Sequence, residues 1–226
     1  YQRRVRGCPQ MNMQQQKALI EFEREHIIIK SEFSEKSNCL WLETVVFTPD
    51  FENIPLQDRQ TVKQNCSLQF RDKSPYDKMI FKAYITLTPS FPSRSPSVGI
   101  QPNAVIHPNI DFASGSVCMA ELKENWNPQT KLSDICNLFL PNLLLQPNPD
   151  DYQDEEARNM FVNDPEQFLK TAESWAQRTC LKWSDFRGVK MTTNFRDKLK
   201  EYLGDALEED LVVTPKNQSP QLIERK

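Results

Sequence analysis

Residues 107–126, HPNIDFASGSVCMAELKENW, contain the side chains with the clearest chemical potential in the chain. They include His107, one of only two histidines, and Asn109, which precedes Cys118 by nine positions. A cysteine in such a segment can be a nucleophile, a metal ligand or a buried apolar residue of the core. The residues around Cys118 indicate which of these three roles it has.

A hydrolytic role for Cys118 would require a histidine as base, and His26 and His107 are the two candidates. Pro108 restricts His107 to an extended backbone, so we expect its ring to be held in the turn rather than to accept protons. A zinc site is disfavoured because His107, Cys118 and Cys136 would still lack a fourth ligand. The sequence therefore predicts no metal and no cofactor.

The other chemistry open to Cys118 is to carry an acyl group as a thioester. Such a carrier receives the group from another thioester, and it needs a donor that stabilises the tetrahedral oxyanion. The uncharged amide of Asn109 suits that role. The carrier also needs an acidic position that orients and deprotonates an incoming lysine amine. Asp150 and Asp151 in QPNPDDY are the candidates, with solvated charges ahead of a helix as the alternative interpretation.

The rest of the sequence predicts the strands that position these residues. Three stretches rich in β-branched and aromatic residues predict an antiparallel meander: 40–47, 61–70 and 79–87. The proline-rich segment SFPSRSPS then forms a fixed loop, and VGIQP predicts a short fourth strand. Residues 107–130 are expected to be ordered but irregular.

Helices are predicted on either side of the strands. One amphipathic helix precedes them and three helices follow: 13–27, 131–146, 154–163 and 164–183. Ser133 is expected to cap the second of these helices, and Pro141 is expected to kink or break it. This order of elements predicts an α+β domain over residues 10–183.

The segments outside this domain are predicted to be a basic tail at 1–9 and a C-terminal extension at 184–226. The extension should contain a helix with Phe195, Leu199, Tyr202 and Leu203 on one side, followed by a disordered end. The net charge of −3 gives no general attraction to nucleic acid or to an anionic membrane. The six widely spaced cysteines do not indicate a disulfide framework, so the cytoplasm and nucleus are the expected location.

HPNID, the cysteine after a short loop, the tryptophan eight residues beyond it and PNPDD together resemble the catalytic core of ubiquitin-conjugating enzymes. SPYDKMIFKAYITLTPSFPSRSPSV is similar to that family's strand and proline-rich loop. SRSPSVGI and the nine-residue step to Cys118 are most similar to the H-type subfamily, which serves a multi-subunit ligase of the GID/CTLH kind. The resemblance implies a UBC fold and transfer of ubiquitin, received from an activating enzyme as a cysteine thioester, to substrate lysines with a RING-type ligase.

The resemblance also implies roles for individual residues. Cys118 would carry the thioester, Asn109 would stabilise the oxyanion or fix the loop, and Asp151 would gate the acceptor lysine. His107 and Pro108 would hold the turn that presents Asn109. The first helix would bind the activating enzyme. The ligase-binding surface would consist of residues in two loops: Pro92, Ser93, Asn127, Pro128 and Gln129.

Some residues depart from the family pattern. Ser93 stands where many members carry a large apolar side chain, which predicts weak docking to HECT-type ligases. The first helix is also less basic than is usual in the family. Three hypotheses follow: a conjugating enzyme for ubiquitin, one for another ubiquitin-like protein, or a non-catalytic scaffold of the same fold. The presence of both Cys118 and Asn109 argues against the scaffold.

Overall fold

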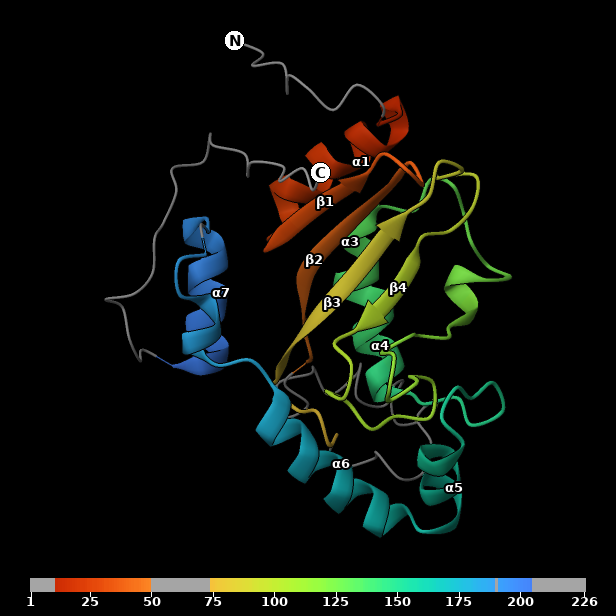
Figure 1. Ribbon diagram of the computed structural model, residues 1–226. Helices are drawn as coiled ribbons and strands as arrows, with labels where there is room; N and C mark the ends of the chain where they lie inside the picture. The colour runs from red at the N-terminus through yellow and green to blue at the C-terminus, as the bar shows by residue number, and fades with distance from the viewer. Residues whose placement is uncertain (1–10, 50–73, 190, 205–226) are drawn as a thin grey trace, which may run out of the picture.

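A four-stranded antiparallel sheet organises the protein, and helices cover it (Figure 1). The computed structural model describes residues 11–49, 74–189 and 191–204. The strands lie side by side in chain order: β1 Lys30–Ser34, β2 Cys39–Phe47, β3 Ile80–Leu87 and β4 Ser97–Ile100. The helical elements are α1 Met13–Glu25, η3 Ala120–Leu122, α3 Leu132–Asp134, η4 Ile135–Phe139, α4 Leu140–Leu145, α5 Glu155–Asn163, α6 Pro165–Thr179, η5 Trp183–Phe186 and α7 Thr193–Leu203.

The composition of the sheet differs from the predicted meander at its first strand. β2, β3 and β4 confirm three of the predicted strands, but β2 pairs directly with β3, so that Val45 lies opposite Lys82. The predicted strand at 61–70 lies outside the described residues. The remaining strand is β1, which the sequence did not indicate because Lys30 and Glu32 are poor strand formers. Antiparallel pairing with β2 at the sheet edge overrides that weak propensity.

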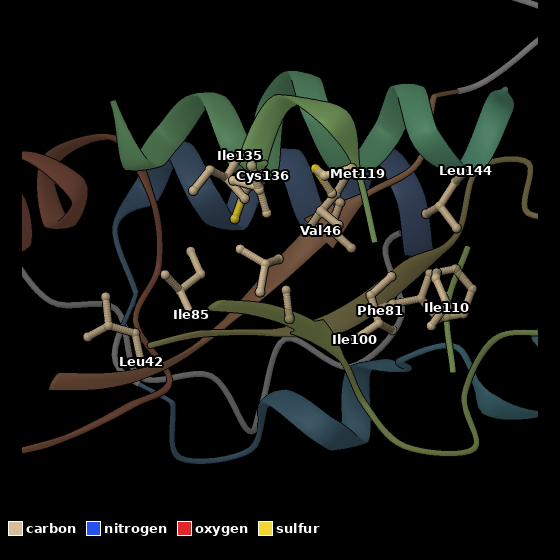
Figure 2. Close-up of a cluster of buried hydrophobic side chains, with 14 of the residues drawn as sticks. Leu42, Val46, Phe81, Ile85, Ile100, Ile110, Met119, Ile135, Cys136 and Leu144 are labelled. Atoms are coloured by element: carbon tan, nitrogen blue, oxygen red, sulfur yellow. The ribbon is translucent and has the colours of Figure 1, made fainter. Parts of the chain in front are cut away.

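The main core lies between the sheet and the helical run from α3 to α4 (Figure 2). Leu42 and Val46 of β2 and Ile85 of β3 are fully buried on this face. Leu42 and Val46 are four positions apart, and such an even spacing keeps both side chains on one face of the pleated sheet. Cys136 lies in the same core, and burial raises the pKa of its thiol to about 12. Cys136 is therefore a core residue, as its apolar surroundings in the sequence predict.

The segment around Pro141 remains helical. The backbone N–H of Leu140 donates to Ile135 O, five residues back, so η4 is a π turn directly before the proline. This wider turn accommodates the proline, which has no N–H and whose ring would crowd a regular helix. The predicted cap is wrong: the Asp134 carboxylate accepts from the N–H of Lys131 at 3.2 Å, and Ser133 is buried.

The other predicted helices form, but two of them are shorter than predicted: α1 ends at Glu25 instead of 27, and α6 ends at Thr179 instead of 183. α1 begins with a capping box, in which the Asn12 side chain accepts from the N–H of Gln15 at 2.8 Å. The Asp164 carboxylate accepts from the N–H of Gln167 at 3.1 Å and caps α6, whose first residue is Pro165. None of the described helices is long and apolar enough to span a membrane.

α7, which lies in the predicted C-terminal extension, packs on the sheet. β1 pairs with Cys39–Glu43 of β2, and α7 lies beside the following part of β2 (Figure 1). The rings of Phe195 and Phe47 are 5.6 Å apart, and the Tyr202 hydroxyl donates to Thr48 O at 2.8 Å. Leu199 is fully buried in this second core. The predicted tail at 1–9 and the end of the extension after 204 lie outside the described residues.

Candidate active site

His107 is the buried centre of the turn that leads to Asn109. Its Nδ1 accepts from the backbone N–H of Asn109 at 3.0 Å, and its Nε2 lies 3.1 Å from Leu143 O. These partners select the neutral tautomer with the proton on Nε2. Burial lowers the pKa of His107 to about 3, although the bond to Leu143 opposes that shift. The ring is therefore neutral at physiological pH and belongs to the scaffold of the turn.

The side chain of Asn109 joins this turn to the loop that contains Asp151. Its Nδ2 donates to Asn148 O and to Asp151 O, both at 2.8 Å. Its Oδ1 accepts from the N–H of Asn148 at 2.8 Å. Asn109 is only 1% exposed, and these three bonds engage both amide hydrogens and the oxygen. The amide therefore holds the Asn148–Asp151 backbone instead of pointing a free N–H at Cys118.

Backbone hydrogen bonds complete the connection between the turn, Cys118 and the acidic loop. Pro108 O accepts from the N–H groups of Gln153 and Asp154 at 2.7 and 3.0 Å. The N–H of Cys118 donates to Asn109 O at 2.9 Å. Three segments that are distant in sequence thus meet at Pro108 and Asn109. This explains how a residue 33 positions after Cys118 can reach it.

A tight turn before Cys118 and a buried side chain after it fix the position of Cys118 relative to β4 and the main core. Gly115 has φ +74°, and a Cβ at this position would lie 1.8 Å from Ile100 O. Only glycine can therefore bring this turn against β4. Met119 is 3% exposed and packs in the main core (Figure 2). Its burial holds the chain immediately after Cys118.

The functional groups meet at the Asp151 carboxylate. The Cys118 thiol donates to Asp151 Oδ2 at 3.1 Å, and Lys123 Nζ lies 3.3 Å from both Oδ1 and Oδ2. The hydrogen bond from Cys118, followed by that from Lys123, lowers the pKa of the Asp151 carboxyl. The same neighbours, Cys118 first, raise the pKa of the Lys123 ammonium. Of the two acidic candidates, it is Asp151 whose carboxylate reaches the sulfur.

This arrangement covers the cysteine. Cys118 is 2% exposed, whereas the side chains of Lys123 and Asp151 are 50% and 48% exposed. A group that reacts with the sulfur must therefore approach past a half-exposed ion pair. Lys123 was not among the site residues predicted from the sequence. The available signal was a lysine five positions after the cysteine, just beyond the short helix η3.

The two predicted docking loops lie together beside α1. Trp126 Nε1 donates to Pro92 O at 2.8 Å, and the Trp126 and Phe91 rings are 6.3 Å apart. Pro92, Pro128 and Gln129 line a groove along α1, and Ser93 and Asn127 are exposed beside it: the structure thus brings all five predicted residues to one surface. Their role in binding a ligase stays a prediction.

The geometry of His107, Cys118 and Cys136 does not support a metal site. Both ring nitrogens of His107 already have partners, and Cys136 is buried in the core between the sheet and α3–α4. In the described ranges, no three His, Cys, Asp or Glu residues are grouped so that they could hold a metal ion. The chemistry available to Cys118 is therefore that of a thiol beside a carboxylate and an ammonium.

Comparison with known proteins shows the family. A family model described as "Ubiquitin-conjugating enzyme" matches residues 43–176, which is more than half of the chain. This chain belongs to the ubiquitin-conjugating enzyme family. "Ubiquitin-conjugating enzyme E2-23 kDa" of Triticum aestivum is 36% identical over 105 residues, covering 46% of this chain. "Ubiquitin-conjugating enzyme E2 5" of Arabidopsis thaliana is 33% identical over 139 residues, covering 61% of this chain.

The extent of these matches differs between the relatives. The aligned segment spans 56% of the wheat protein and 72% of the Arabidopsis protein. Among solved structures, the E2 domain of a Toxoplasma gondii ubiquitin conjugating enzyme is similar, with a TM-score of 0.51 at 20% identity. That match covers 74% of this chain and 96% of the solved chain. Together with the observed element order, it shows that the predicted UBC fold is correct.

Proposed function

We propose that this protein is an active ubiquitin-conjugating enzyme, which accepts ubiquitin on Cys118 as a thioester and passes it to lysine side chains. The observation that supports this most directly is the 3.1 Å contact between the Cys118 sulfur and the Asp151 carboxylate. A cysteine that served only as packing would not need a half-exposed acidic group above it. Membership of the family supplies the modifier and the activating enzyme as the expected partners.

The transfer step uses Asp151 as the group that moves the proton. Loading exchanges one thioester for another, so the ubiquitin carbonyl becomes bonded to the Cys118 sulfur. An acceptor lysine amine then attacks that carbonyl carbon, a C–N bond forms, and the C–S bond breaks with its electron pair on sulfur. One proton from the amine has to leave, and Asp151 is placed to take it. Because the same carboxylate lies 3.1 Å from the sulfur, it can return that proton to the departing thiolate.

Asn109 supports this step indirectly in our proposal. Its amide holds Asp151 through the carbonyl of that residue, at 2.8 Å. Both amide hydrogens are engaged by carbonyl groups, so a direct bond to the oxyanion would require one of those bonds to open. Of the two roles that the resemblance implies, the contacts favour fixing of the loop. His107 and Pro108 act in turn by holding Asn109.

The choice of ligase follows from the docking surface. The exposed Ser93 offers little apolar area beside the Pro92 and Pro128 loops, which disfavours HECT-type ligases. We propose instead a dedicated RING-type partner that makes further contacts, such as a multi-subunit ligase of the GID/CTLH kind. The proposal also assigns the protein to the H-type subfamily and to the cytoplasm and nucleus. The similarity of SRSPSVGI and of the Asn109–Cys118 step to that subfamily supports it.

The test of the proposed function is a loading reaction with matched cysteine variants. The wild type, with activating enzyme, ATP and ubiquitin, should give a band shift that a reducing agent removes. Cys118→Ser should give an ester that resists reductant and is cleaved by alkali, while Cys118→Ala should give no adduct. Cys136→Ala serves as the control because that thiol packs in the main core, whereas it is the Cys118 thiol that contacts the Asp151 carboxylate. An adduct on Cys118→Ala, or loading only with another ubiquitin-like protein, would contradict the proposal.

A further inference from the structure

Lys123 occupies the place that an acceptor lysine needs. Its ammonium lies 3.3 Å from both oxygens of Asp151, the carboxylate that contacts the Cys118 sulfur. An acceptor amine that attacks a thioester on that sulfur has to enter the same few ångströms. The structure therefore contains a lysine of its own in the position of the substrate lysine.

The charges at this position show what each kind of acceptor would meet. Lys123 and Asp151 together carry no net charge. A second lysine ammonium that pairs with Asp151 would lie beside the Lys123 ammonium, and like charges so close repel each other. The hydrogen bonds from Cys118 and Lys123 also lower the pKa of Asp151, which makes the carboxylate a weaker base toward an acceptor. An acceptor lysine that has no charged residue next to it should therefore react more slowly at this site.

An acceptor that carries a carboxylate next to its lysine avoids this repulsion. That carboxylate can pair with Lys123, whose side chain is 50% exposed, and leave Asp151 free for the acceptor amine. The site then holds two positive and two negative charges. We propose that Lys123 is a specificity-determining residue that favours acceptor lysines flanked by Asp or Glu. This inference rests on the proposed function, since it concerns the discharge of a thioester on Cys118.

The experiment compares two peptides in single-turnover discharge. Purified Cys118 thioester, separated from activating enzyme and ATP, is mixed with an Asp-Lys-Asp peptide or with the uncharged Asn-Lys-Asn peptide. Both are of equal length and are blocked at both ends. Exposed ion pairs of this kind are typically weak, so the wild type should discharge to the acidic peptide about three- to five-fold faster. The ratio should fall toward one at high salt, because exposed charges are screened.

Variants at one position separate selection from a structural effect. Lys123→Met should reduce the rate ratio to about one, and Lys123→Glu should reverse it, whereas Lys123→Arg should preserve it. Lys170→Met removes another exposed lysine, which is paired with Glu166 on α6, and should keep the wild-type ratio. Because each ratio is taken within one variant, a general loss of activity or folding does not enter it.

The outcomes distinguish this inference from the proposed function. If the wild type forms no thioester, the proposed function fails. If the thioester forms and discharges, but Lys123→Met retains the wild-type preference between the peptides, Lys123 does not select acceptors. A wild-type ratio of one at low salt would overturn the inference equally.

Discussion

Lowering the pH from 7 to 5 should destabilise this protein because His107 must remain neutral in its turn. Protonation at Nδ1 would place an N–H directly against the backbone N–H of Asn109, which now donates to that nitrogen at 3.0 Å. The ring is also fully buried, and this desolvation lowers its pKa to about 3. In the unfolded chain a histidine has a pKa of about 6.5.

The size of the effect follows from these two pKa values. Between about 6.5 and about 3 the unfolded state binds a proton on His107 that the folded state does not bind. The free energy of unfolding therefore falls as the pH falls through this window, and the loss begins at the upper value. From pH 7 to pH 5 this single group should cost about 2 kcal/mol. His26, whose pKa is also lowered by burial, contributes in the same direction.

The measurement is urea unfolding at pH 7 and pH 5, followed by tryptophan fluorescence. The wild type is compared with His107→Gln and His26→Gln, which together account for both histidines of the chain. His107→Gln should be less stable at pH 7 but should lose about 2 kcal/mol less than the wild type between the two pH values. His26→Gln should retain most of the loss. Carboxylates interfere little, because they titrate largely below pH 5.

The result that would refute this reasoning is an equal loss of stability in the wild type and His107→Gln. NMR titration of the wild-type imidazole signals gives a check that does not depend on the stability of the variant. The His107 signals should not shift between pH 7 and pH 4.5. A midpoint near 6 for His107 would show that the ring is solvated and that its role in the turn is misassigned.

Three further substitutions test the loop, the docking surface and the C-terminal helix. Asn109→Ala should lower stability by about 1–3 kcal/mol and slow discharge to lysine, because it frees the Asp151 loop; unchanged stability with a 10²–10³-fold slower discharge, as is typical for loss of an oxyanion donor, would instead favour the oxyanion role. Ser93→Phe should add about 2 kcal/mol of apolar contact and increase transfer with HECT-type ligases, with loading by the activating enzyme as the control; equal HECT activity would exclude this position as the limit. Leu199→Ala should lower the unfolding free energy by about 2–4 kcal/mol, whereas exposed Asn194→Ala should have little effect; equal thermal midpoints would show that α7 does not contribute to the core.

Local patterns in the sequence were sufficient to predict those helices and strands whose formation depends mainly on their own residues. The helical spacing of α1 and the β-branched and aromatic residues of β3 are properties of short segments, and the structure confirms both elements. The edge strand β1 could not be predicted in this way. Its pairing with β2 supplies a stabilisation that the propensities of Lys30 and Glu32 do not show.

The candidate site shows the same difference between what local sequence predicts and what tertiary contacts decide. From the sequence alone, the candidate groups were Cys118, Asn109 and a carboxylate from Asp150 or Asp151, since residue type and motif spacing identify chemistry. Only the tertiary structure decided that Asp151 reaches the sulfur and that the Asn109 amide holds the loop. It also brought Lys123 to the carboxylate. These are side-chain contacts between segments that are distant in sequence, and their geometry depends on how the whole domain packs.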